Sequence, residues 1–233
     1  KDVFIAATRK IRFISKSADE LEPTERVKKI ATLFSTFKNP DKETVLTPWK
    51  VVNMHMGETI GGYIFYDFEN DLVLDKEKYI ENGNITKEIF EDTSSKILDI
   101  NSKTGLYPLY IVYSIYKNIL ADNDFTFEEK LKIWDFVVEN NMFVVCKTPM
   151  AKSITKRTLV GYRNVSVNTR YFEDLVNQLK DVRKEKNFIN KVTSANYWNR
   201  KDDDKIMRFK AIVGNPPYQG VNHSQVYPYF YLT

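Results

Sequence analysis

Phe209-Lys210-Ala211-Ile212-Val213-Gly214 is a short, mostly apolar run, and Asn215-Pro216-Pro217-Tyr218 follows it directly. The apolar run predicts a buried β-strand. The two prolines then end any sheet pairing or helix, because neither has an N–H group and each fixes its own φ. Asn215 precedes a proline, so we expect it to be extended. The segment therefore predicts a stiff loop at the carboxyl end of a strand.

This loop carries groups that suit a flat ring bearing an amine. The Asn215 side chain and the Pro216 carbonyl supply two acceptors for the amine, and the Tyr218 ring supplies a face for stacking. The alternative interpretation is a strand followed by a proline turn with no chemical role. We favour the chemical interpretation because the tetrapeptide stands directly after an apolar strand.

The composition indicates a soluble globular protein. The chain has 233 residues, of which 42% are apolar and 28% charged, and 15 Phe and 14 Tyr are available for a core. No apolar run is long enough to span a membrane. Cys146 is the only cysteine, so no disulfide framework is expected and a cytoplasmic location is the simplest prediction.

Charge is distributed unevenly along the chain. Residues 1–146 hold 19 Lys and Arg against 24 Asp and Glu, whereas residues 147–210 hold 16 against 7. A basic block beside a chemical loop predicts a polyanionic partner such as double-stranded DNA, and a solvated lysine-rich surface is the alternative. The basic residues that we predict to contact DNA are Lys147, Lys152, Lys156, Arg157 and Arg163.

The first part of the chain is predicted to be helical. We expect an N-terminal helical segment over residues 1–44, with a firm helix that begins near Pro23 and ends at Asn39-Pro40. A further helix is expected after Thr47-Pro48, and Tyr63 to Phe68 alternates as a strand does.

From Lys96 onward the pattern alternates between β and α. We expect strands at 96–100 and 142–146, a third near Val192 and a fourth at 209–214. The helices between them are expected at 109–120, 126–138, 149–159 and 171–186. This order predicts a parallel sheet with crossover helices, whose site lies at the carboxyl ends of the strands. Asp99, Thr148 and Asn215 are expected at those ends.

Three blocks resemble the N6-adenine DNA methyltransferases. Asn215-Pro216-Pro217-Tyr218 matches the catalytic loop of that family, and residues 98–106 resemble its S-adenosylmethionine loop. Residues 46–52, which contain Thr47-Pro48, resemble its Thr-Pro block. The order of the three blocks is similar to that of the gamma class, which includes many bifunctional restriction–modification enzymes. The resemblance covers roughly residues 44–233.

The resemblance implies a fold, a reaction and a set of site residues. The fold is a Rossmann-like, S-adenosylmethionine-dependent methyltransferase core at residues 45–233. The reaction is methyl transfer to adenine N6, with no metal, and its catalytic loop is Asn215, Pro216, Pro217 and Tyr218. The residues expected to bind the cofactor are Thr47, Pro48, Asp99, Asn101, Gly105 and Thr148.

The sequence departs from the family pattern at three places in the cofactor region. Lys103 replaces a second glycine, residues 145–148 lack the acid that holds the ribose, and residues 191–194 lack the acid that meets the adenine ring. These departures favour an alternative, a non-catalytic DNA-binding or assembly module. A second alternative is methylation of a glutamine side chain or an RNA base, because the same loop chemistry serves both.

The expected sheet is incomplete. The four strands placed near Ile97, Val144, Val192 and Ile212 account for only part of a methyltransferase sheet, and residues 211–233 carry no charge. We therefore expect the rest of a longer polypeptide, or a partner subunit, to supply the other strands and target recognition.

Overall fold

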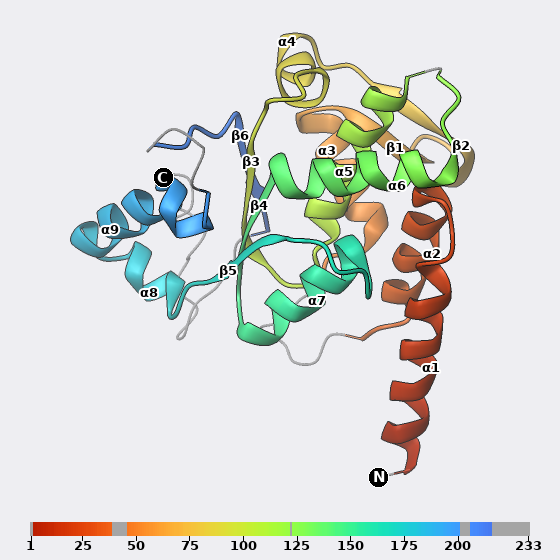
Figure 1. Ribbon diagram of the computed structural model, residues 1–233, viewed down its shortest axis with the longest axis horizontal. Helices are drawn as coiled ribbons and strands as arrows, with labels where there is room; N and C mark the ends of the chain where they lie inside the picture. Colours follow the sequence, from red (N-terminus) through yellow and green to blue (C-terminus); the bar gives the residue numbers. More distant parts are fainter. Residues whose placement is uncertain (1, 39–45, 122, 201–205, 216–233) are drawn as a thin grey trace.

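The computed structural model describes residues 2–38, 46–121, 123–200 and 206–215 (Figure 1). The helices are α1 (Asp2–Ala18), α2 (Pro23–Ser35), α3 (Trp49–Thr59), α4 (Asn84–Thr86), α5 (Leu106–Leu120), α6 (Phe127–Asn140), α7 (Pro149–Val160), α8 (Leu175–Leu179) and α9 (Val182–Val192), with a π-helical turn η1 (Lys87–Glu91) and a 3₁₀ turn η2 (Ala195–Trp198). The strands are β1 (Gly62–Asp67), β2 (Leu72–Ile80), β3 (Ile97–Ser102), β4 (Met142–Cys146), β5 (Asn168–Tyr171) and β6 (Ala211–Gly214). None of the described helices combines the length and the apolarity needed to cross a bilayer.

Four parallel strands form the central sheet in the order β5-β4-β3-β6. In its register, Asp99 of β3 lies opposite Val144 of β4 and Val213 of β6. Because all four strands run the same way, their carboxyl ends share one edge of the sheet. β1 and β2 form a separate antiparallel hairpin.

Side chains alternate between the two faces of the sheet, and each face has its own core. Ile97 and Val144 join a buried cluster with α5, α6 and α7, whereas Leu98 and Phe143 join a second cluster with α8 and α9. Figure 1 shows α5, α6 and α7 on one side of the sheet and α8 and α9 on the other. Helices on both faces of a parallel sheet confirm the predicted Rossmann-like α/β class.

The elements whose predicted bounds agree best with the structure are those that begin at a clear sequence signal, such as a capping residue or a proline. β4 occupies residues 142–146 as expected. Thr148 caps α7 by accepting a hydrogen bond from the Ala151 N–H, and Pro149 is the first helical residue. Thr126 and Glu129 form a capping box at the start of α6, where a helix was expected from residue 126.

Three predictions about the elements after β4 were wrong. The helix expected at 171–186 is the end of β5 followed by the separate helices α8 and α9. The strand expected near Val192 is the last turn of α9, and the third strand is β5. β6 begins at Ala211 and is only partly buried, with Ile212 50% exposed, because it pairs with β3 alone among the described strands.

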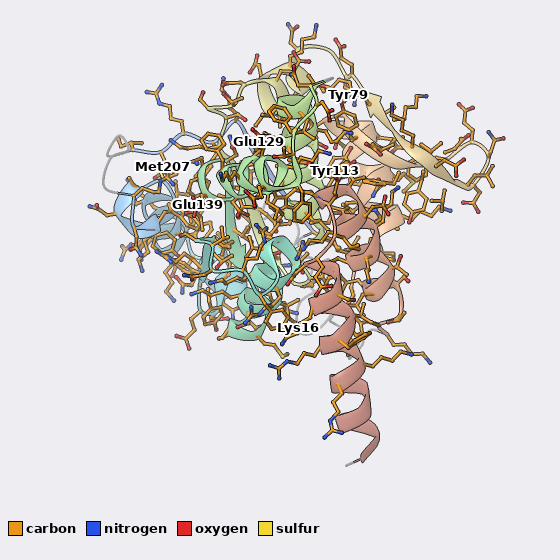
Figure 2. The ribbon with its side chains drawn as sticks, turned by 45° about the vertical axis from the view of Figure 1, so that its right-hand side comes forward. Lys16, Tyr79, Tyr113, Glu129, Glu139 and Met207 are labelled. Atoms are coloured by element: carbon orange, nitrogen blue, oxygen red, sulfur yellow. The ribbon has the colours of Figure 1, made fainter. Side chains whose placement is uncertain are left out.

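A buried arginine on α2 connects the N-terminal helices to α7. The Arg26 guanidinium on α2 is 2% exposed, forms an ion pair with Asp19 at 3.0 Å, and donates to the carbonyls of Arg157, Thr158 and Leu159. Those carbonyls belong to the last turn of α7, where a cation also complements the helix dipole. Tyr113 of α5, which is labelled in Figure 2, also donates a hydrogen bond to Thr24 of α2.

Candidate active site

Two hydrogen bonds join the three sequence blocks at the carboxyl edge of the sheet. Asn215 follows β6 directly, and its Nδ2 donates to Thr47 Oγ1 at 2.6 Å. Asn101 follows Ile100 in the last part of β3, and its Nδ2 donates to the backbone oxygen of Asn215 at 2.9 Å. The Thr-Pro block, the loop after β3 and the first residue of the Asn-Pro-Pro-Tyr loop therefore meet at one point, although 168 positions separate Thr47 from Asn215. Pro216, Pro217 and Tyr218 lie outside the described residues.

Unusual backbone conformations bring these segments together. Gly214 has φ +149°, and a Cβ there would stand 2.3 Å from the Ile100 carbonyl oxygen, so only glycine lets β6 run this close to β3. Asn101 has φ +67°, a left-handed conformation that asparagine tolerates better than most residues. Gly105 has φ +79°, and a Cβ there would stand 3.0 Å from Thr155 Cα in α7.

Asp99 is a buried carboxyl group beneath this meeting point. It is 1% exposed, and its Oδ2 has no hydrogen-bond partner in the part of the chain that the structure describes. Burial raises the pKa of Asp99 to about 8, against a smaller opposite effect of a hydrogen bond with Ser102. Asp99 was expected at the end of the strand. Because β3 continues to Ser102, Asp99 instead lies in the middle of the strand, where its carboxyl group is buried.

The raised pKa of Asp99 predicts a pH-dependent stability. Between pH ~4 and ~8 the unfolded chain has lost this proton while the folded chain keeps it, so the stabilisation is complete at low pH and disappears as the pH rises through about 8. Asp99→Asn should remove this fall in the free energy of unfolding. Urea denaturation of both proteins across this range measures it, and parallel pH curves for the two would contradict the prediction.

Most of the predicted cofactor residues line one small cavity of about 20 Å³. Thr47, Asp99, Asn101, Gly105 and Asn215 contribute to its wall. Five further residues line it: four of them lie within residues 98–106, the stretch expected to form the cofactor loop, and the fifth follows that stretch directly. These are Ser102, Lys103, Thr104, Leu106 and Tyr107.

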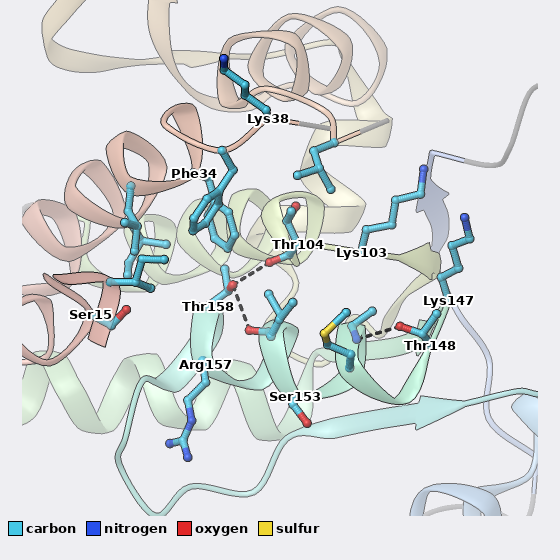
Figure 3. A pocket seen from close by; sticks show the side chains of 18 of the residues that line it. Ser15, Phe34, Lys38, Lys103, Thr104, Lys147, Thr148, Ser153, Arg157 and Thr158 are labelled. Atoms are coloured by element: carbon cyan, nitrogen blue, oxygen red, sulfur yellow. Dashed lines mark hydrogen bonds between the residues drawn. The ribbon is translucent and has the colours of Figure 1, made fainter. Parts of the chain in front are cut away.

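A larger pocket of about 770 Å³ adjoins the small cavity, and the two share Lys103 and Thr104 (Figure 3). It lies between α1, α2 and α7, and apolar side chains form most of its wall. Thr148, expected to bind the cofactor, lines this pocket and not the small cavity, and its hydroxyl is the cap of α7. Pro48 lines neither of the two.

The five basic residues predicted to contact DNA lie at different positions before, within and after α7. Lys147 lies in the loop between β4 and α7 at the carboxyl edge, and Lys152 lies in the first part of the helix. Lys156 and Arg157 lie in its second half, and Arg163 follows its end. Lys147 and Lys152 are therefore the nearest of the five, along the chain, to the edge that carries Asn215.

Arg163 and Arg157 have contacts within the protein. Arg163 Nη1 donates to both carboxylate oxygens of Asp135, at 2.5 and 2.6 Å. Arg157 lies over the Tyr162 ring, with 4.1 Å between its Cζ and the ring centroid. Both side chains have structural contacts to lose, so charge reversal at these sites would change the fold as well as any DNA contact.

The acid expected after the third strand was placed at the wrong position, residues 191–194, because the third strand is β5. Glu173 and Asp174 follow β5 within three residues and are exposed. The absence of an acid after the third strand was therefore an error of strand placement. After β4 the departure stands, since Cys146 is followed by Lys147 and Thr148.

Cys146 ends β4 close to the site. Its thiol is 1% exposed and lies 3.8 Å from the Thr155 hydroxyl. Burial raises the pKa of Cys146 to about 12, so the thiol stays protonated at neutral pH. It is a packing residue, as its burial among apolar neighbours suggests.

The last part of the chain carries a recognisable sequence. Residues 140–232 match the Eco57I restriction-modification methylase family. This methylase match begins just before β4 and runs through the Asn-Pro-Pro-Tyr loop, and it supports a methylase of a restriction–modification system. The Thr-Pro block and the loop after β3 lie outside the methylase match, so their link to it rests on the hydrogen bonds to Asn215. No curated protein matches the chain.

Proposed function

We propose that this protein transfers a methyl group from S-adenosylmethionine to N6 of adenine in double-stranded DNA, as the modification activity of a restriction–modification system. One observation carries the proposal: Asn215 stands at the carboxyl edge of a methyltransferase-like sheet, tied to Thr47 and Asn101. The Eco57I methylase match covers the same loop.

The chemistry of the small cavity fits this cofactor. The buried carboxyl of Asp99 has an oxygen without a described partner, which suits a hydrogen-bonding ligand. Asn101 and Gly105 turn the backbone of the loop, and α5 begins there, which favours close approach of a ligand. A cavity of about 20 Å³ holds roughly one water molecule, so this ligand would enter only as the cavity opens.

When bound, the cofactor supplies an electrophilic methyl group, and the protein prepares the nucleophile. Adenine N6 is a weak nucleophile because its lone pair is delocalised into the ring. In the proposal, Asn215 Oδ1 and the Pro216 carbonyl accept hydrogen bonds from the two N–H groups, which favours a pyramidal nitrogen with a free lone pair. Tyr218 stacks on the base after the base leaves the duplex.

The protein would hold the reacting atoms in line, and this positioning accounts for much of the rate. Asp99 and the Asn101–Gly105 loop would hold the cofactor, and Asn215 would hold the amine. The DNA backbone would contact basic groups near the same edge, foremost Lys147 and Lys152. Such contacts weaken with salt because each neutralised phosphate releases counterions.

Labelled methyl transfer tests the proposal directly. The full-length protein is incubated with duplex DNA and S-adenosylmethionine labelled on the methyl group, and the DNA is then digested to nucleosides. We expect the label in N6-methyladenine and none in 5-methylcytosine, because the two acceptors match an exocyclic amine and not a ring carbon.

Other outcomes would replace the proposal. Label in a protein glutamine or in RNA would support the alternative substrates. DNA binding without label, and without a thermal shift at saturating cofactor, would support a non-catalytic module. A ligand at 100 times its dissociation constant stabilises by about 2.7 kcal/mol, so an intact cofactor site would be visible in this measurement.

A further inference from the structure

The contact between Thr47 and Asn215 assigns a task to the Thr-Pro block. We propose that Thr47 is a positioning residue, whose hydroxyl fixes the Asn215 amide so that Oδ1 faces the target amine. The inference rests on the proposed function and concerns a residue that had been expected to bind the cofactor.

The Asn215 amide needs such a partner. The terminal torsion of asparagine is broad and nearly two-fold, so a free amide exchanges the places of its oxygen and nitrogen at little cost. If Nδ2 faced the target amine, a donor would meet a donor. In the observed orientation Thr47 Oγ1 accepts from Nδ2 at 2.6 Å, which occupies the nitrogen and leaves Oδ1 as the acceptor for substrate. A hydroxyl can also donate, so the contact restrains the rotation of the amide, and the N–H groups of the target amine select its oxygen.

Thr47 is well placed for this task and is not used as a helix cap. The N-cap residue of α3 is Pro48, and no side chain caps that end of the helix. Pro48 also disfavours a helical backbone at Thr47, which limits where the hydroxyl can lie. Trp49, the first residue of α3, is 6% exposed and packs against Phe65 and Tyr110, so the segment that carries Thr47 is anchored in the core.

The backbone of Asn215 is held independently. Asn101 Nδ2 donates to the Asn215 carbonyl oxygen at 2.9 Å, and Gly214 pairs with Ile100 in the sheet. Removing the Thr47 hydroxyl should therefore free the amide to rotate without displacing the chain. The contact controls orientation and not the location of the loop.

The test compares two substitutions in the full-length protein. Thr47→Val keeps the shape and removes the acceptor, and Thr47→Ser keeps the hydroxyl. We expect Thr47→Val to lower kcat about 3- to 10-fold, the effect of one hydrogen bond, with the KM for DNA and the dissociation constant of S-adenosylmethionine unchanged. Thr47→Ser should restore most of kcat. The matched control is Thr59→Val, at an exposed position in α3.

Three results would overturn the inference. An unchanged kcat in Thr47→Val would show that the amide is fixed in another way. A weaker cofactor affinity that accounts for the lost rate would return Thr47 to the cofactor site. An undiminished effect of Thr47→Val in an Asn215→Ala background would show that the two residues act separately. Failure of the proposed function is distinct, because the parent protein would then transfer no methyl group to adenine.

Discussion

Replacing Asn215 with alanine should lower the rate of methyl transfer by about 100-fold or more while the protein remains folded. The substitution removes one of the two proposed acceptors for the amine. The fold should persist because the bond from Asn101 goes to the backbone oxygen of residue 215, which alanine keeps. Single-turnover transfer to N6-methyladenine at saturating cofactor measures the effect.

The control for this experiment is Asn187→Ala, which removes an exposed amide from α9 on the opposite side of the sheet from α5. It should transfer methyl groups at the parent rate. An Asn215→Ala protein that works within a few-fold of the parent would refute the assignment of residue 215 as the catalytic amide.

Arg26→Leu should cost about 3–5 kcal/mol of folding free energy, because it breaks a buried ion pair and leaves the other groups unsatisfied. Asp19 would lose its partner, and the three carbonyls in the last turn of α7 would lose their donors. Asp19 also accepts from the Tyr162 N–H at 2.8 Å, so the whole junction of α1, α2 and α7 depends on this pair. Urea denaturation measures the loss.

The matched substitution is Lys29→Leu, at a less buried position on the same helix. It should change the stability by less than about 0.5 kcal/mol, as surface substitutions usually do. A double variant, Asp19→Leu with Arg26→Leu, should lose less than the sum of the two single losses. Additive losses, or a loss below about 1 kcal/mol for Arg26→Leu alone, would contradict a joint role for the pair.

Local signals explain why some elements could be predicted from the sequence. Thr148 and Pro149 mark the start of α7, and a cap and a helix-initiating proline act through their immediate neighbours. The run of apolar residues in β4 has the length of a buried strand and stands between polar residues. No distant part of the chain is needed to interpret such patterns.

The error after β5 has a physical cause. Leu175 and Leu179 of α8 pack in the same cluster as Phe188 of α9, so the apolar spacing continues across the break between the two helices. Asp181 caps α9 by accepting from the Arg183 and Lys184 N–H groups, and this cap is a local signal that the apolar spacing concealed. β2 was missed because most of its residues are exposed.

The candidate site was predictable only in part. Asp99, Asn101, Gly105 and Thr47 were chosen by resemblance, and the structure places them around one cavity with Asn215. The bond between Thr47 and Asn215 joins residues 168 positions apart, and no local pattern reports such a contact. The burial that raises the pKa of Asp99 is likewise a property of the packed sheet.

The packing of Cys146 makes the protein convenient for spectroscopic labelling. It is the only cysteine in the chain, and its protonated, enclosed thiol should react slowly with alkylating reagents. A fluorophore attached to an introduced cysteine would therefore mark one place without prior removal of the native thiol. Met150, 71% exposed at the first turn of α7, offers such a place beside the larger pocket, where the dye would report the arrival of a ligand or of DNA.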